Sequence, residues 1–146
     1  MTTKPYLGVL ATASLVLLAA CGTTATSTPS SSGKNWLSLG VSQNSNILHE
    51  LDQTSVKKNG QVVTFRDKKT FTDISKEHFQ YLPKHKYSLN TWEMNCANKT
   101  YRLVATQLIA ENGTEVWQKT FDFNTAPTRK IVAGSSTDKQ YQAVCR

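Results

Sequence analysis

The sequence contains few of the residues from which enzymes and metal proteins build their sites. It has three cysteines and three histidines in 146 residues, with no Cys-x-x-Cys pair and no closely spaced pair of histidines. GxSxG, HExxH, a phosphate-binding glycine loop and a calcium-binding loop are all absent from it. These absences leave no recognisable catalytic or metal-binding motif. We therefore predict a non-enzymatic protein that uses no cofactor and no metal.

The three histidines are the remaining candidates for acid-base catalysis. His49 precedes Glu50, His78 follows Glu77, and His85 lies between two lysines. A histidine beside a glutamate in a strand or loop is usually a solvated polar pair, whereas proton transfer requires a partner within hydrogen-bond reach. We interpret all three histidines as non-catalytic side chains.

No apolar run in the sequence is long enough to favour a permanent transmembrane helix. The longest, Tyr6 to Ala20, falls short of the roughly 18 to 20 apolar residues that such a helix needs. It follows a single positive residue, Lys4, and ends in small residues, which is the layout of a secretory signal. The sequence therefore predicts a signal peptide over residues 1–20, with ordinary secretion or a retained anchor as the alternatives.

The segment Leu18-Ala19-Ala20-Cys21 resembles the bacterial lipobox, in which the cysteine thiol receives diacylglycerol and the freed amine receives a further acyl chain such as palmitate. Two or more acyl chains anchor a protein stably, because each buried methylene adds roughly 0.8 kcal/mol. Gly22 follows the cysteine in place of the aspartate that retains lipoproteins in the inner membrane. We predict lipidation at Cys21 and delivery to the outer membrane, with exposure at the cell surface left open.

Large apolar side chains are missing between the predicted anchor and Asn35, because residues 21–34 are rich in serine and threonine. Such a segment cannot bury enough surface to offset the entropy of ordering. We predict a flexible tether there, followed by a single domain over residues 35–146.

Removing Cys21 for lipidation leaves an even pair of cysteines, Cys96 and Cys145. The compartment outside the cytoplasm allows disulfides, and neither residue has the neighbours of a catalytic thiol or a zinc ligand. We predict that the two form a disulfide.

Six segments that mix apolar and polar residues, several of them bounded by turn residues, are predicted to be strands. Two of the connections, at Asn59-Gly60 and Asn112-Gly113, have the sequence of tight hairpin turns. The stretch from Thr72 to Lys86 is interpreted as a loop. The predicted strands are Trp36–Val41, Ile47–Asp52, Val62–Phe71, Tyr87–Cys96, Tyr101–Ala110 and Thr114–Phe123.

A short carboxyl-terminal helix is predicted after Ser135 and Ser136, since Asp138 provides an acid in the first turn and Tyr141 and Val144 share a face with Cys145. The disulfide then pins this helix to the sheet. The last two strands are apolar on both faces, so we expect a cover on each, the second by another protomer as a homodimer. Trp36, Trp92 and Trp117 are assigned to the core.

Acidic residues are scarce, with 10 against 17 lysines and arginines and a formal charge of +7. A basic exported domain favours acidic partners such as lipopolysaccharide, sulfated glycans or acidic protein patches, and its compartment argues against nucleic acid. Solubility alone also explains exposed lysines. The lysines predicted as ligand-binding residues are Lys57, Lys58, Lys68, Lys69, Lys84 and Lys86, with Arg129-Lys130 as a further basic pair.

Several short motifs together resemble the surface-adhesin protein E family. They are Trp36 near the start, Tyr87-Ser88 opening a strand that ends in Glu93-Met94-Asn95-Cys96, then Tyr101-Arg102, Asn112-Gly113 and the final Val144-Cys145. The resemblance covers nearly all of residues 35–146, and Asn95 departs from the aspartate expected before the cysteine. It implies an α+β, mainly β fold, with an antiparallel sheet of about six strands and a carboxyl-terminal helix held by a disulfide.

The same resemblance implies a protein that is often dimeric and that, in the best-known member, binds host proteins such as vitronectin, laminin and plasminogen. Our leading hypothesis is accordingly a lipid-anchored outer-membrane adhesin that binds a macromolecular partner such as a host matrix or serum protein. The alternative is a periplasm-facing envelope or assembly lipoprotein that contacts lipopolysaccharide, cell wall or another membrane protein. Protease treatment of intact cells distinguishes the two.

Overall fold

The computed structural model describes residues 35–146. The predicted signal peptide, Cys21 and the tether lie outside the described residues. Within residues 35–146, no helix combines the length and the apolar character that crossing a membrane requires.

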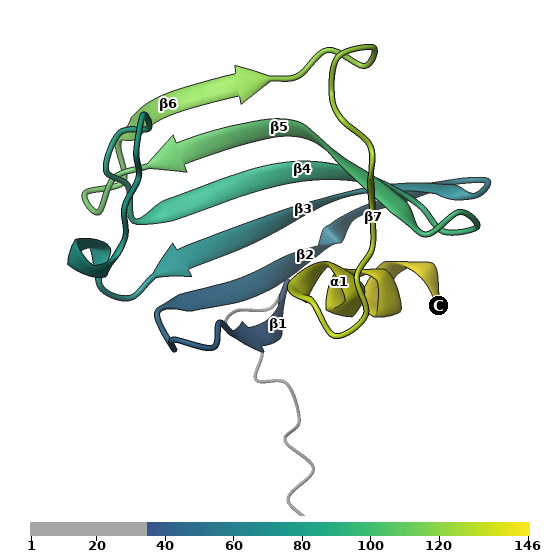
Figure 1. The fold of residues 1–146 in the computed structure, drawn as a ribbon, viewed down its shortest axis with the longest axis horizontal. Coiled ribbons are helices and arrows are strands. Elements are labelled where there is room, and N and C mark those ends of the chain that lie inside the picture. The colour runs from purple at the N-terminus through teal and green to yellow at the C-terminus, as the bar shows by residue number, and fades with distance from the viewer. Residues whose placement is uncertain (1–34) are drawn as a thin grey trace, which may run out of the picture.

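The chain forms an antiparallel sheet in which neighbours in sequence are neighbours in space, in the order β1-β2-β3-β4-β5-β6 (Figure 1). A two-residue strand, β7, pairs with Thr100 and Tyr101 of β5, beyond the end of β6. The strands are β1 (Trp36–Val41), β2 (Ile47–Asn59), β3 (Val62–Phe71), β4 (Tyr87–Asn95), β5 (Thr100–Ile109), β6 (Glu115–Thr120) and β7 (Arg129–Lys130). The helices are the 3-10 turn η1 (Ile74–Lys76) and α1 (Ser136–Cys145).

The fold prediction is confirmed, since the structure is mainly antiparallel sheet with one carboxyl-terminal helix and the predicted disulfide. The largest difference is in β2, which continues to Asn59 although the sequence predicted a strand ending at Asp52. Its pairing with β3 shifts register between Asp52 and Lys57, where Thr54 donates from both its backbone N–H and its hydroxyl to the Asp52 carboxylate. This bulge interrupts the alternation of apolar and polar residues. The sequence pattern therefore did not predict the second half of the strand.

Helix α1 begins where the capping residues predicted it. Ser135 is the N-cap, and its hydroxyl oxygen accepts a hydrogen bond from the backbone N–H of Asp138 at 3.1 Å. The Asp138 carboxylate in turn accepts from the backbone N–H of Gly134 at 2.9 Å. These reciprocal bonds satisfy donors that the first helical turn leaves free, so they define the start of a helix of only ten residues.

The hydrophobic core is small and lies between the sheet and α1. Its fully buried members are Leu51, Val63, Phe65, Met94 and Val144, and they come from three adjacent strands and the helix. On β3, Val63 and Phe65 alternate with side chains that face the opposite side of the sheet. Among the described residues, the strands, α1 and this core all lie within 36–146 and form one folding unit.

The predicted disulfide joins Cys96, directly after β4, to Cys145 at the end of α1. The two Cα atoms are 5.5 Å apart, a separation typical of disulfides. The Tyr141 hydroxyl donates to the Cys96 carbonyl at 3.3 Å, which adds a second link at the same place. Helix α1 is thereby attached to the sheet at the turn between β4 and β5.

Replacing both Cys96 and Cys145 by alanine is expected to lower the free energy of unfolding by about 4 kcal/mol. The disulfide closes a loop with a sequence separation of 49, and losing it returns that loop's entropy to the unfolded chain. Urea unfolding of the oxidised wild type and the double variant measures the difference. A change below about 1 kcal/mol would show that helix docking does not depend on the bond.

Candidate binding groove

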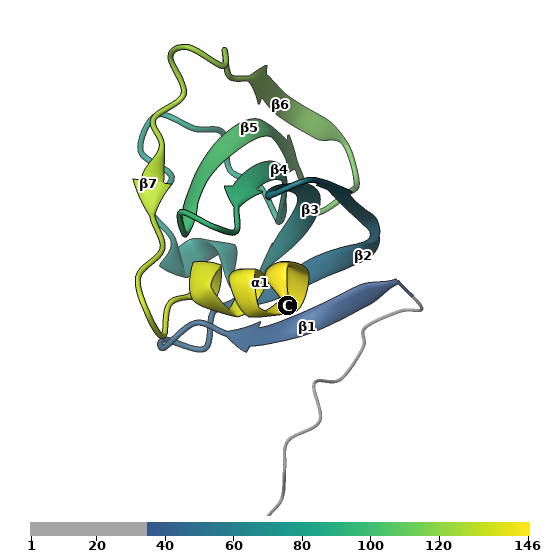
Figure 2. The ribbon, with the colours of Figure 1, turned by 90° about the vertical axis from the view of Figure 1, so that its right-hand side faces the viewer.

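The two faces of the sheet are covered very differently. Helix α1, β7 and the segment 72–86 that contains η1 lie on the same side of the sheet (Figure 2). Within residues 35–146, no further element packs against the other side, which we call the open face. The expectation of a cover on both faces therefore holds for one face within the described chain.

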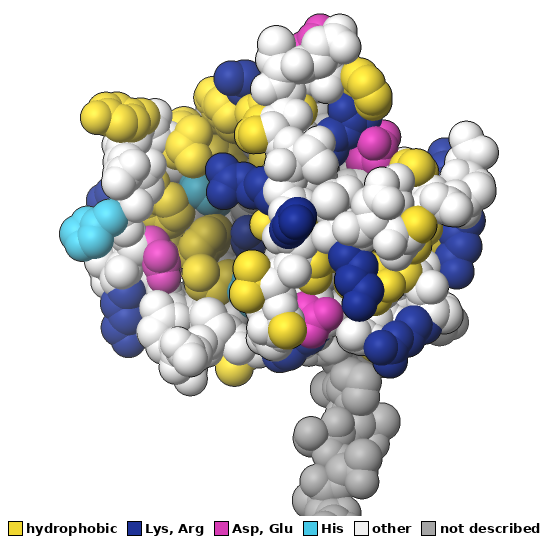
Figure 3. Space-filling model, turned by 45° about the vertical axis from the view of Figure 1, so that its right-hand side comes forward, with side chains coloured by type: hydrophobic (Ala, Val, Ile, Leu, Met, Phe, Trp, Pro, Cys, Tyr) yellow, Lys and Arg dark blue, Asp and Glu magenta, His cyan; other side chains and the backbone are white. Residues whose placement is uncertain are grey.

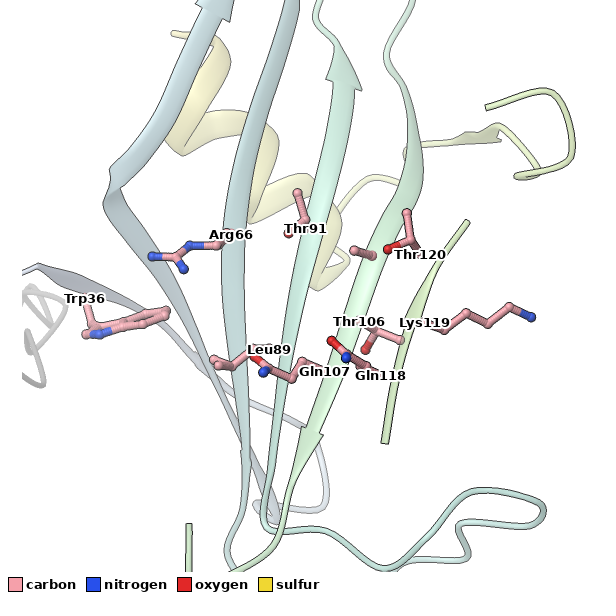
Figure 4. Close-up of a pocket in the computed structure, with 10 residues that line it drawn as sticks. Trp36, Arg66, Leu89, Thr91, Thr106, Gln107, Gln118, Lys119 and Thr120 are labelled. Carbon is pink, nitrogen blue, oxygen red and sulfur yellow. The ribbon is translucent and has the colours of Figure 1, made fainter. Parts of the chain in front are cut away.

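A groove of about 530 Å³ crosses the open face from β1 to β6. Figure 4 shows Trp36 at one side and Lys119 at the other, with side chains of the intervening strands between them. A second depression of about 310 Å³ shares Arg66 and Thr91 with the groove and extends it toward β2. The groove is lined by Trp36, Arg66, Leu89, Thr91, Ala105, Thr106, Gln107, Gln118, Lys119 and Thr120.

Two ion pairs lie on the open face near the Trp36 side of the groove. Glu50 and Asp52 of β2 pair directly with Lys68 and Arg66 of β3 at 2.8 and 2.6 Å. Both acids are almost completely buried, whereas more than half of the Arg66 side chain is exposed. Burial alone would raise the pKa of Asp52, but the hydrogen bonds from Thr54 and Arg66 hold that pKa below its usual range. Asp52 therefore stays charged and neutralises Arg66, which lies beside it.

Trp36 was predicted to be a core residue, and the structure places it on the open face instead. It pairs with Asp52 across β1 and β2, and its ring lies 4.5 Å from the Lys68 ammonium, measured to the ring centroid. This cation-π contact orients the indole over the Glu50–Lys68 ion pair. One carboxylate oxygen of Glu50, Oε1, is buried there and has no hydrogen-bond partner among residues 35–146.

The groove offers chemistry suited to binding. Its amides and hydroxyls donate and accept hydrogen bonds, while Trp36 and Leu89 provide apolar surface. No histidine lines it, and the nearby acids Glu50 and Asp52 are paired with bases. A long, shallow, mixed surface of this kind fits an extended macromolecule better than a small substrate enclosed from water.

On the helix side, a buried polar network joins the sheet to α1. Asp67 of β3 accepts hydrogen bonds from the amides of Asn90 and Gln140 at 2.8 and 2.6 Å, and Asn90 accepts from Thr106 and Ser88. Burial raises the pKa of the Asp67 carboxyl, while the charge of Lys69 and the hydrogen bonds act in the opposite direction. Every donor in this network is directed at an oxygen, so it orients the helix on the sheet.

The structure separates the histidines from the acids that precede or follow them. His49 and Glu50 are adjacent on β2, so their side chains extend to opposite faces of the sheet. His85 is buried against Phe71 and Phe79, and its Nδ1 lies 2.8 Å from the Pro83 carbonyl oxygen. His78 is exposed, while Glu77 accepts a hydrogen bond from Asn46. Among residues 35–146 no three histidine, cysteine or acidic side chains gather as a metal site would require.

The predicted ligand-binding lysines do not form one surface. Lys57 and Lys58 lie at the β2–β3 hairpin, whereas Lys84 and Lys86 lie beyond the opposite ends of these strands. Lys68 and Lys69 extend to opposite faces, and Lys68 is neutralised by Glu50 while Lys86 approaches Glu111. The residues that the structure does bring together in the groove were not found by sequence analysis. In the sequence these residues stand out only as the polar positions of alternating strands. Every strand with one face in solvent has such positions, so they do not identify a groove.

An antiparallel meander with a short carboxyl-terminal helix on one face, joined to it by a disulfide, defines a class of small, mainly β domain. Within that class, the chain belongs to the surface-adhesin protein E family, whose family model matches residues 36–146. Membership supports a role as a surface adhesin, indicates a protein of the cell surface or envelope, and favours a non-enzymatic role. No curated protein sequence matches the chain significantly.

Solved structures of protein E from Haemophilus influenzae have the same fold. Its crystal form II superposes with a TM-score of 0.55 at 16% sequence identity, over 81% of this chain and 92% of that chain. The selenomethionine form superposes with a TM-score of 0.53 at 15% identity, over 77% and 87%. At these identities the likeness establishes the fold alone.

The stability of the domain is expected to fall between pH 6.5 and pH 4 because of His49. Burial, followed by the charges of Lys69 and Lys139, lowers the pKa of this histidine to about 4. In the unfolded chain the imidazole is protonated near pH 6.5, whereas in the folded protein it is protonated only near pH 4. The contribution of His49 to stability is therefore complete above pH 6.5 and is lost as the pH falls toward 4. After allowance for the solvent that reaches the ring, the loss is about 1 to 2 kcal/mol.

Urea unfolding at pH 7 and pH 4.5 tests this expectation in the wild type and in His49→Gln. His49→Gln should lose less stability than the wild type between the two pH values. Asp67 also contributes to the pH dependence of stability, but its contribution cancels in the comparison because both proteins carry it. His78→Gln, at an exposed position, is the matched control and should follow the wild type. Equal losses in all three proteins would contradict the assignment to His49.

Proposed function

We propose that the protein is a lipid-anchored outer-membrane adhesin that binds an extended host macromolecule through the groove on its open face. The match of residues 36–146 to the surface-adhesin family carries the proposal. The family resemblance makes host matrix and serum proteins the partner class, with laminin, vitronectin and plasminogen as the first ligands to test. Lipidation at Cys21 anchors the domain, and the segment between Cys21 and Asn35 spaces it from the membrane.

The shape and chemistry of the open face support this choice of surface. The groove and the depression next to it run across most of the sheet, and strands β1 to β6 all contribute side chains to them. The acids Glu50 and Asp52 are paired with the bases beside them, so the exposed charge left at the edges of the two depressions is the positive charge of Lys119 and Lys57, which favours acidic groups on the partner. Self-association through the same face, as predicted from the sequence, remains an alternative occupant of the groove.

Thr91→Arg is expected to weaken partner binding at least about tenfold, a change of about 1.4 kcal/mol. Thr91 lines both depressions, so a long cationic side chain at this position fills the groove at its centre. The measurement is binding of residues 35–146 to immobilised laminin, vitronectin and plasminogen. Thr114→Arg, in the exposed β5–β6 turn, makes the same chemical change outside the groove and should bind as the wild type does. Equal behaviour of the two variants would exclude the groove as the binding surface.

Protease treatment of intact cells is expected to remove the domain, because an adhesin has to face outward. In Cys21→Ser cells the protein should leave the membrane fraction, since the thiol that receives the lipid is gone. Immunoblots of shaved cells and of separated fractions provide both readouts. A domain that resists protease on intact cells but is cleaved after the outer membrane is opened would support the periplasm-facing alternative and rule out the adhesin.

A further inference from the structure

Within residues 35–146, most of the exposed basic residues that no ion pair neutralises lie at one end of the sheet, whereas Lys84, Lys119 and Lys139 lie elsewhere. Ion pairs neutralise Arg66, Lys68, Lys76, Lys86 and Arg102. Six exposed basic residues without an ion-pair partner in residues 35–146 lie instead at the end that carries the disulfide, and we call them the basic end. They are Lys57, Lys58, Lys99, Arg129, Lys130 and Arg146. Figure 3 shows lysine and arginine side chains spread over this side of the molecule with few acids among them.

Separate segments of the chain meet at the basic end because of the fold. The β2–β3 hairpin, with Lys57 and Lys58, lies beside the turn that holds Lys99, because the Cys96 backbone N–H donates to the Gln61 carbonyl at 2.8 Å. Strand β7 brings Arg129 and Lys130 opposite Tyr101 and Thr100. The disulfide brings the last residue, Arg146, to the same turn.

Acidic side chains offset little of this charge. The pKa of Asp138, at the start of α1, is lowered first by the hydrogen bond from Gly134 and then by the hydrogen bond from Gln142. The positive charges of Arg146 and Lys99 lower it further. Glu93 of β4 accepts two hydrogen bonds from the guanidinium of Arg102 on β5, at 2.9 and 2.8 Å, so its charge is already paired. The basic end therefore presents a net positive surface to solvent.

The start of the domain is directed toward this same end. The Asn35 carbonyl accepts from the Gln53 backbone N–H, and β1 runs antiparallel to β2, so its first residue points toward the β2–β3 hairpin. Lys57 lies roughly 13 Å farther along β2. Cys21 precedes Asn35 by 14 positions, which limits the anchor to at most about 50 Å from the domain.

We infer that the basic end binds the phosphate groups of the membrane surface that carries the anchor, and so orients the domain on it. The inference rests on the lipid anchor of the proposed function. A lipid anchor together with a cluster of basic residues holds a protein on an anionic surface more firmly than either does alone. In this orientation the groove from Trp36 to Lys119 lies along the side of the domain, where a long partner can reach it, while the depression that contains Lys57 lies next to the headgroups.

Vesicle cosedimentation of residues 35–146 tests the inference without the anchor, because these residues form one folding unit. The vesicles contain phosphatidylcholine alone or phosphatidylcholine with one third phosphatidylglycerol. The wild type should bind only the anionic vesicles, and added salt should weaken that binding. Lys58→Glu with Lys130→Glu should weaken it at least about twenty-five-fold, because each lysine near an anionic surface contributes about fivefold.

The matched control is Lys76→Glu with Lys84→Glu, which makes the same change in net charge at the opposite end of the sheet. Its binding should stay within about threefold of the wild type. Equal weakening by the two double variants would overturn the inference, because net charge alone would then explain binding. Retention on immobilised heparin without binding to anionic vesicles would also overturn it, in favour of a sulfated glycan.

The result is separable from the proposed function. Vesicle binding does not involve Cys21 or a host protein, so its failure leaves the groove variants and the protease experiment to decide the adhesin role. Conversely, the domain could bind vesicles through Lys58 and Lys130 and yet resist protease on intact cells. That result would support the inference about the basic end and rule out the adhesin function.

Discussion

The disulfide between Cys96 and Cys145 is the constraint on which the rest of the molecule depends. A helix of ten residues is marginal in water, and the core that it covers has only five fully buried apolar side chains. The bond holds α1 against the sheet at the turn after β4, where Tyr141 also reaches the Cys96 carbonyl. With the helix in place, Val144 completes the core and Gln140 reaches the buried Asp67 carboxylate. Reduction of one bond would therefore affect packing, the polar network and the position of Arg146 together.

The division of the sheet into a covered and an open face determines where a partner can bind. The covered face carries the core and the network around Asp67, and its side chains are used in holding α1. On the open face, charges that would otherwise be costly are paired across strands, Glu50 with Lys68 and Asp52 with Arg66. Trp36 lies over one of these pairs and forms a wall of the groove. The same strands therefore supply stability on one side and a binding surface on the other.

Local signals predicted most of the fold. Asn59-Gly60 identified the β2–β3 hairpin, where Gly60 has a φ of +58° that other residues rarely adopt, and β3 runs over the predicted Val62–Phe71. Ser135 and Asp138 defined the start of α1. Strand β7 was missed because two residues leave no periodicity, and β2 was cut short because its bulge breaks the alternation. Trp36 was misplaced because a large aromatic residue fits a core and an exposed aromatic contact equally well by sequence.

The sequence by itself determined most of the strands, the helix start, the pairing of Cys96 with Cys145 and the excess of positive charge, because each depends on near neighbours or on counting. Only the tertiary structure decided which charges remain free. Lys68 is next to Lys69 in the chain, yet one is paired with Glu50 on the open face and the other lies on the covered face. Lys58, Lys99, Lys130 and Arg146 are far apart in sequence and meet at one end. Groove and basic end alike arise from contacts between distant segments, which strand register and the disulfide establish and which no local pattern encodes.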